Sequence, residues 1–245
     1  MMRLSIFRSA LAACVAGAVA VSPVMADGTL DGTIGAGYGA PIAIDGFGDR
    51  AGFPGNMDLG DLYFWENGTD IYFAMTANGT DSWGNYMFFI EADNAALKAG
   101  SSDGNGWVRP ISAPGAPGFA PSHWIGSWNG GAQLWQFVGA GNGSGGTGNG
   151  WNQTHSSTVN PADIDQNFDF SAAPATLELR VSRAALGNPA TVRIVGMSSG
   201  TNGGDTAVDS VPSNADPANW GDPVILSNAT SPIAVPVELS AFGLD

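Results

Sequence analysis

The chain has 245 residues, of which 44% are hydrophobic and 12% charged, and its formal net charge at pH 7 is −14. This is the composition of a folded protein rather than a disordered one, and the acidic balance argues against nucleic acid and anionic lipid as partners. The 36 glycines and 15 prolines predict many turns, and the length fits one large all-β domain better than two small ones.

Residues 1–26 have the features of a bacterial secretory signal peptide. Arg3 and Arg8 precede an apolar run, and the segment ends in a small-x-small pattern at Ala26. Cleavage there would remove both arginines and Cys14, leaving six basic residues against 22 acidic ones, a formal charge of −16, and no cysteine. The sequence therefore predicts a secreted protein, periplasmic, at the cell surface or extracellular, without disulfides or thiolate metal sites.

No membrane anchor is predicted. Leu11–Cys14 resembles a lipobox, but the apolar run between Arg8 and Cys14 is shorter than the roughly 7 to 15 residues of a signal h-region. No second apolar segment approaches the roughly 20 residues that a membrane-spanning helix needs. We therefore expect no membrane insertion and a mature chain that is soluble outside the inner membrane.

The first half of the mature chain predicts several strands. A short edge strand is expected at residues 41–44. Leu59–Glu66 alternates in polarity and turns at Asn67-Gly68 into Ile71–Thr76, which predicts a β-hairpin. Tyr86–Ile90 is apolar throughout, as expected of a central strand that is buried on both faces.

The segment Pro121–Val138 predicts an aromatic hairpin around Asn129-Gly130-Gly131. If Trp128 faces Ala132 across this turn, alternation assigns the large side chains to two faces. These are Trp124 and Trp128 on one face, and Ile125, Trp135 and Phe137 on the other. One face would then belong to the core and the other would be free to form a site.

After this hairpin we expect a flexible loop at residues 139–150 and an acidic loop at 160–170. Further strands are expected at 176–181, 191–197, 223–226 and 235–242, and one helical turn at Ser182–Leu186 that stops at Gly187. The pattern, roughly nine to eleven strands and almost no helix, predicts an all-β antiparallel β-sandwich over residues 27–230. Residues 231–245 would be a C-terminal strand or linker tail.

The order of these elements is similar to that of a known family. The segments concerned are DGTLDGTIGAGYGAPIAI, GFGD, DLGDLYFWENGTDIYFAMTANGT, FIEADN and, later, VSRAALG. Together they resemble the DOMON-like domains related to family 9 carbohydrate-binding modules, over most of Asp27–Met197. The resemblance implies a jelly-roll-type β-sandwich exported to the cell surface or medium and often concerned with glycans. Family 9 modules clamp a sugar between tryptophans, and the sequence does not show which residues would form that pair here.

The eight tryptophans are the natural candidates for a sugar site, because the C–H faces of pyranoses stack on flat aromatic rings. The predicted ligand-binding residues are Trp107, Trp124, Trp128 and Trp151, three of which adjoin loops rich in Gly, Asn or Ser. Trp65 and Trp135 are expected in the core, because their strands alternate cleanly. Tryptophans of β-sandwiches are mostly core residues, so exposure decides between the two roles.

Asp163, Asp165 and Asp169, with Asn167 between the last two, place oxygen ligands at alternate positions, as at the start of an EF-hand loop. Phe168 stands where that loop needs glycine, and Pro174 stands where it needs glutamate. A solvated acidic loop is therefore the favoured interpretation, and a Ca²⁺ site of another geometry is the alternative.

Few residues point to catalysis. His123 and His155 are the only histidines, and no nucleophile elbow, HExxH motif or phosphate loop occurs. Haem would need axial Met and His ligands, and the placement of Met75 and Met87 within apolar strands argues against it. A carboxylate pair for glycoside hydrolysis remains open, because sequence does not reveal distances.

The leading expectation is a secreted, non-catalytic protein that binds a polysaccharide or cell-surface glycan through exposed tryptophans. The first alternative is a structural or adhesive subunit of a surface, matrix or filament, in which loops and aromatic residues serve self-association. The second alternative is a glycoside-acting enzyme.

Overall fold

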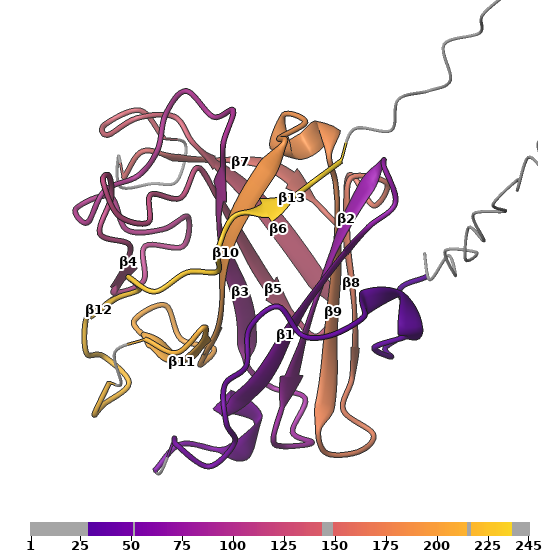
Figure 1. The fold of residues 1–245 in the computed structure, drawn as a ribbon. Helices are drawn as coiled ribbons and strands as arrows, with labels where there is room; N and C mark the ends of the chain where they lie inside the picture. Colours follow the sequence, from indigo (N-terminus) through magenta and orange to yellow (C-terminus); the bar gives the residue numbers. More distant parts are fainter. Residues whose placement is uncertain (1–28, 51, 144–148, 215–216, 237–245) are drawn as a thin grey trace, which may run out of the picture.

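A computed structural model describes residues 29–50, 52–143, 149–214 and 217–236 (Figure 1). These residues form thirteen strands, in two antiparallel sheets and one short parallel pair, and no α-helix, which confirms the predicted all-β, sandwich-like class. Within them, no helix has the length and apolarity to cross a membrane. The predicted signal peptide and residues 237–245 of the predicted tail lie outside the described residues.

Two large sheets and one small sheet make up the fold. The first sheet has the order β1 (Leu59–Glu66), β2 (Asp70–Ala77), β9 (Ala175–Ser182), β8 (Ile164–Asp169). The second has the order β11 (Ala207–Val211), β10 (Thr191–Ser199), β3 (Asn85–Ala92), β5 (His123–Trp128), β6 (Gly131–Phe137), β7 (Trp151–Ser156), with β13 (Ile233–Ala234) also on β10. A parallel pair, β4 (Ile111–Ser112) and β12 (Val224–Ile225), forms the small sheet. Three 3-10 turns complete the described elements: η1 (Ala36–Tyr38), η2 (Gly55–Met57) and η3 (Ala184–Leu186).

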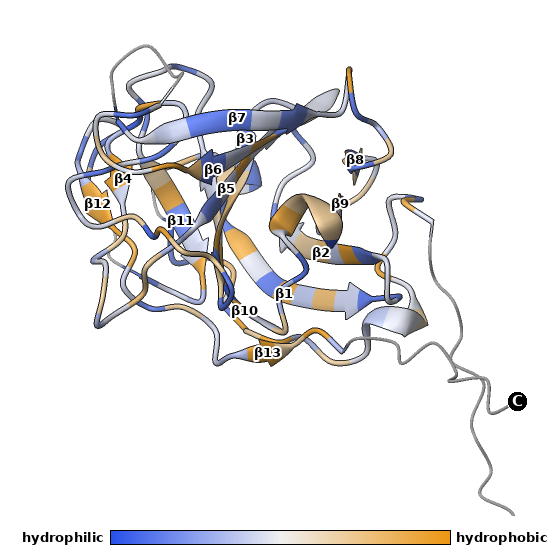
Figure 2. Cartoon of the chain, turned by 90° about the horizontal axis from the view of Figure 1, so that it is seen from above, coloured by the Kyte–Doolittle hydropathy of each residue, from blue (hydrophilic) through white to orange (hydrophobic). Residues whose placement is uncertain are grey.

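The main core lies between the two large sheets. Phe73 of β2 stacks on Phe88 of β3 with ring centroids 5.3 Å apart, and Ile125 and Leu179 are among the buried residues around them. In Figures 1 and 2 the two sheets form neighbouring layers, and β4 and β12 lie beyond the second sheet, on the side away from the first. The second sheet is therefore covered on both faces.

A second apolar cluster fills the space between the second sheet and the irregular segment that follows β3. It contains the inward-facing Phe119 of that segment and three indoles from the sheet. Strand β3 sends Phe88 into the main core and Phe89 into this second cluster. The prediction that Tyr86–Ile90 is a central strand buried on both faces is confirmed.

The aromatic hairpin forms, but in a different register from the predicted one. β5 and β6 pair Trp128 with Gly131, so the turn is the two residues Asn129-Gly130. The predicted pairing of Trp128 with Ala132 is wrong by one residue, because Asn-Gly alone suffices for a tight turn between strands. A slip of one residue turns every side chain of one strand to the opposite face.

Because of this register, the large aromatic side chains of the hairpin lie on one face instead of being divided between two faces. Trp124 pairs with Trp135, so Trp135 and Phe137 share the face of Trp124 instead of opposing it. Gly126 lies between the rings on this face, where an added Cβ would stand 2.5 Å from Trp107. Only a glycine leaves room for that indole to lie on the strand.

Other sequence predictions have mixed outcomes. The hairpin of β1 and β2 is confirmed, and so are the strands β9 and β10. The helical turn exists as η3, and Gly187 ends it in the left-handed conformation at φ 78°. The predicted acidic loop is wrong over Ile164–Asp169, which is β8 at the edge of the first sheet.

Candidate functional site

An open cleft of about 300 Å³ lies at one end of the second sheet. Asn85 at the start of β3 pairs with Ser199 at the end of β10, so the loops next to these two residues meet at the same end of the sheet. The loop before β3 contributes Trp83, and the segment after β11 contributes Trp220. The remaining lining residues come from the turn between β10 and β11: Thr201, Asn202 and Asp205.

Two indoles form the aromatic part of the cleft. The ring centroids of Trp83 and Trp220 are 6.3 Å apart, and their planes are inclined at 43°. Trp83 is 40% exposed, which is high for such a large apolar side chain, whereas Trp220 is half-buried. Phe53 supports Trp220 from another direction with an edge-on contact at 4.9 Å.

Hydrogen bonds from buried residues fix the backbone of both indoles. The side-chain amide of Asn56, which is completely buried, donates to the carbonyl of Trp83. The N–H of Thr206, the residue before β11, donates to the carbonyl of Trp220 at 2.6 Å. The backbone of each indole is therefore tied to a buried residue elsewhere in the chain, Asn56 of η2 and Thr206 next to β11.

Asp205 supplies the charge of the cleft. Its side chain is mostly buried, and Oδ2 accepts the N–H of Asn202 at 2.8 Å. A Cβ on Gly200 would stand 2.1 Å from that oxygen and 2.9 Å from Cζ3 of Trp220, so only glycine allows this approach. The cleft thus combines two aromatic faces with a carboxylate, an amide and a hydroxyl, groups that can bind sugar C–H faces and sugar hydroxyls.

The structure places the four predicted tryptophans outside this cleft. Trp124 and Trp151 are completely buried, so the prediction that they are exposed stacking surfaces is wrong. Trp124 packs edge-on against Trp107 at 4.8 Å, and the indole N–H of Trp151 donates to the carbonyl of Asp103 at 3.0 Å. Both belong to the core beneath the irregular segment, together with Trp135.

Trp107 and Trp128 are half-buried near the tip of the hairpin. Their centroids are 6.0 Å apart, and the indole N–H of Trp107 donates to Oε1 of Gln133 at 2.8 Å. The guanidinium of Arg109 lies over the Trp107 ring at 5.3 Å. Protein groups therefore occupy much of the surface of the Trp107 ring, whereas the Trp83 ring is the more open one.

The three predicted metal ligands do not come together. Asp163 accepts a hydrogen bond from the hydroxyl of Ser182, and Asp169 accepts one from the backbone N–H of Ser171. Asp165 and Asp169 lie four residues apart on β8, which places them roughly 13 Å apart along the strand. They therefore do not form one calcium site, because a strand separates side chains that a loop could have gathered.

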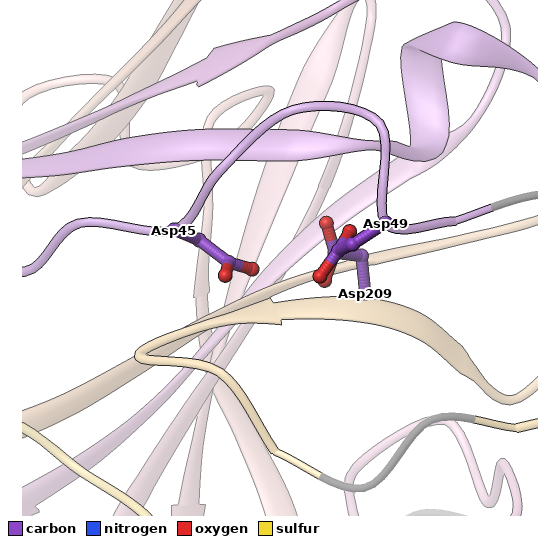
Figure 3. A group of neighbouring side chains, drawn as sticks. All are labelled: Asp45, Asp49 and Asp209. Atoms are coloured by element: carbon purple, nitrogen blue, oxygen red, sulfur yellow. The ribbon is translucent and has the colours of Figure 1, made fainter.

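A different group of carboxylates does converge, as Figure 3 shows. Asp45 and Asp49 come from the segment before β1 and Asp209 from β11, with one oxygen of each within 4.8 Å of the others. Arg50 pairs with Asp209 at 2.7 Å, and the N–H of Leu59 donates to the other oxygen of Asp209 at 2.6 Å. Since Arg50 already supplies a positive charge, this group serves first as an ion-pair network between β1 and β11.

The electrostatics of this network favour a shared proton. Burial raises the pKa of Asp209 to about 7, although Arg50 acts in the opposite direction. Burial also raises the pKa of Asp45, with a smaller contribution from Asp49. At mildly acidic pH the proton that these carboxylates retain relieves their mutual repulsion.

Sequence reasoning missed both tryptophans of the cleft. Each lies in a polar loop directly before a glycine, as Ser82-Trp83-Gly84 and Asn219-Trp220-Gly221. A tryptophan in a polar loop does not belong to the buried face of a predicted strand. This position in the sequence could have identified Trp83 and Trp220 as candidates. No protein-family model matches the chain, and no curated protein matches it either.

Proposed function

We propose that the protein is a secreted, non-catalytic, carbohydrate-binding β-sandwich whose sugar lies in the cleft between Trp83 and Trp220. The observation that carries this proposal is the convergence of two indoles with Asn202 and Asp205 in one open cleft. Aromatic rings supply stacking surfaces, and the short polar side chains supply hydrogen-bond partners for hydroxyl groups. The resemblance to DOMON-like domains favours the same class of ligand.

The dimensions of the cleft favour a short ligand. Its volume of about 300 Å³ is at the lower end of the ~300–1,000 Å³ typical of small-molecule sites. A single sugar unit or the end of a glycan chain fits such a volume better than a long internal stretch. The carboxylate of Asp205 repels acidic groups, so the sugar in this cleft is a neutral one.

The acidic residues of the cleft support a binding role rather than hydrolysis. Among the described residues that line it, Asp205 is the one with a carboxylate. Glycoside hydrolysis by the usual mechanisms needs two carboxyl groups roughly 5 to 9.5 Å apart across the scissile bond. Asp205 alone can bind a hydroxyl but cannot supply both an acid and a second carboxylate.

The test is isothermal titration calorimetry of the purified mature protein against a panel of neutral oligosaccharides and soluble polysaccharides. Replacement of Trp83 or Trp220 by alanine should weaken binding about tenfold or more, which corresponds to ~1.4 kcal/mol. Trp128→Ala is the matched control, because it removes a half-buried indole outside the cleft and should leave the affinity unchanged.

Two results would overturn the proposal. The first is the absence of heat with every glycan, and the second is an equal loss of affinity in Trp83→Ala and Trp128→Ala. Light scattering of the unliganded protein over a range of concentrations distinguishes the alternative of a self-associating matrix subunit. A strict monomer that binds a glycan would exclude self-association as the main function.

A further inference from the structure

A second hollow, of about 240 Å³, adjoins the small parallel sheet of β4 and β12. Its lining contains three serines and one cation, Arg109, together with the apolar side chains of Pro110, Ile111, Pro223 and Val224. Ser101 and Ser102 are exposed, and Ser112 belongs to β4. The guanidinium and the hydroxyl groups are the parts of this lining that a charged ligand could contact.

Arg109 is 6% exposed and, like the equally buried Arg183, has no carboxylate within ion-pair distance in the described residues. Its Nη1 group donates to Oγ of Ser199 at 2.6 Å and to the carbonyl of Gly200 at 2.9 Å. Burial lowers the pKa of Arg109, and the nearby charge of Asp205 only partly offsets this. The guanidinium is therefore a buried charge without a direct counter-ion.

One edge of this guanidinium has no acceptor. Nε is buried and has no hydrogen-bond partner, and no described residue accepts a hydrogen bond from Nη2. Nε and Nη2 lie side by side in the planar group, and their N–H bonds are parallel. This is the edge that binds the two oxygens of a carboxylate, sulfate or phosphate in bidentate fashion.

The other described arginines differ from Arg109 in how their Nη groups are held. Arg50, Arg180 and Arg193 each pair with a carboxylate, at 2.7 to 3.1 Å. Arg183 is as deeply buried as Arg109 and its Nε also lacks a partner, but both of its Nη groups donate to backbone carbonyls. In Arg109 only Nη1 donates to described residues, so its Nε–Nη2 edge is available to an acceptor from a separate molecule.

We propose that Arg109 and the serines around it bind an oxyanion, either a small free anion or the acidic substituent of a saccharide. Planar carboxylate and tetrahedral sulfate share the paired oxygens that the Nε–Nη2 edge recognises. In a protein with a formal charge of −14, a buried arginine without a counter-ion is a selective site, because the surrounding surface repels anions elsewhere. The site adjoins the neutral-sugar cleft, because Nη1 of Arg109 also donates to the carbonyl of Asp205 at 3.4 Å, but it uses the other edge of the guanidinium, and the proposal does not rest on sugar binding.

The test follows the Nε–Hε signals of the arginines by NMR in ¹⁵N-labelled full-length mature protein. Sodium sulfate is titrated against sodium chloride at equal ionic strength, and glucuronate is titrated against glucose. The Arg109 signal, assigned by its disappearance in Arg109→Lys, should shift saturably with sulfate or glucuronate. The Arg50 signal is the internal control and should not move, because its Nε already donates to Oδ1 of Asp209 at 2.7 Å.

Two variants guard against a fold defect in Arg109→Lys. Ser102→Asp places a negative charge on an exposed residue of the hollow and should weaken the anion about tenfold or more, whereas Ser102→Asn should not. A response to sulfate alone would identify a free anion, and a response to glucuronate with none to glucose would identify an acidic saccharide. Equal shifts with chloride, equal shifts of all arginines, or no shift of Arg109 would overturn the proposal.

Discussion

The protein contains two aromatic regions that differ in how they meet solvent. The buried layer under the irregular segment includes Trp124 and Trp151, which have no exposed surface at all. The cleft at the end of the second sheet has Trp83, which is 40% exposed, next to the half-buried Trp220. The first pair comes from strands and the second from loops.

The difference shows that tryptophan has two separate roles in this fold. The indoles of the strands fill the space between β3, β5, β6 and β7 and the irregular segment that covers them. They therefore belong to the apolar core on that face of the sheet. In the loops, hydrogen bonds from buried residues fix the backbone of two indoles, of which Trp83 is exposed and Trp220 packs against the main core. Stability should therefore depend on the first pair and ligand binding on the second.

The largest expected effect tests the buried layer. Trp124→Ala should lower the free energy of unfolding by about 3–5 kcal/mol, because it leaves a cavity between Trp107 and Trp135. Chemical denaturation measures the loss, and calorimetry on the folded fraction should show an unchanged sugar affinity. Trp83→Ala should give the reverse, a stability change within ~1 kcal/mol and a loss of affinity. A similar stability loss in both variants would remove the distinction.

The next effect is the dependence of stability and affinity on pH. The carboxylates of Asp45, Asp49 and Asp209 converge, and the segment that carries Asp45 and Asp49 also carries Phe53, which packs on Trp220 of the cleft. The pKa of Asp209 is raised by burial from 3.8 to about 7, so the folded state holds the proton more tightly than the unfolded state. The protonated Asp209 carboxyl therefore contributes to the free energy of unfolding. This contribution is complete below about pH 4, decreases as the pH rises to about 7, and is lost above that.

We expect the decrease over this window to be on the order of a few kcal/mol. Melting temperatures from pH 4 to pH 8 measure it, and Asp209→Asn should flatten the profile because the titrating group is gone. A profile in Asp209→Asn that still falls as steeply as the wild type would show that another group is responsible. Ligand affinity of the cleft should fall along with stability, whereas the near-ultraviolet signal of the buried layer should stay constant until unfolding.

A smaller effect tests the geometry of the cleft. Gly200→Ala would place a Cβ 2.1 Å from Oδ2 of Asp205, so the carboxylate must move and sugar affinity should fall about tenfold. Gly203→Ala in the same turn is the matched control, because nothing lies within 4 Å of its added Cβ. Calorimetry with the best ligand of the panel measures both. Equal affinities of the two variants would indicate that Asp205 does not contact the sugar.

The smallest effect concerns Trp107, which packs against the buried layer from outside the sheet. Gln133→Ala removes the acceptor of the Trp107 indole and should cost about 1 kcal/mol of stability, without any change in sugar affinity. Gln136→Ala on the same strand is the control, because that side chain is exposed and makes no described hydrogen bond. Denaturation midpoints measured side by side provide the comparison, and identical midpoints would contradict the role of Gln133.

Local pattern was sufficient for much of the fold. The alternation of Leu59–Glu66 and its Asn-Gly turn predicted the first hairpin, and the unbroken apolar run of β3 predicted a strand with two buried faces. The edge strand β8 was missed because most of its side chains are only partly buried. In β8 only Ile164 and Phe168 are buried, so its sequence has the composition of a loop.

The site could not be predicted in the same way. Asn129-Gly130-Gly131 permits a two-residue or a three-residue turn, and the choice between them decides which face carries Trp135. Trp83 and Trp220 become neighbours only because β3, β10 and β11 bring their loops to one end of the sheet. Such contacts depend on topology, which periodicity does not contain.

The separation of Trp83 and Trp220 along the chain, more than half of its length, has a thermodynamic consequence. The cleft exists only when both loops are in place, so a sugar that bridges the two indoles binds the native state and not the unfolded chain. By mass action, a ligand at 100 times its dissociation constant would stabilise the fold by about 2.7 kcal/mol. The glycan would then act as a reversible cross-link between two distant loops, in a mature chain whose sequence predicts no disulfide.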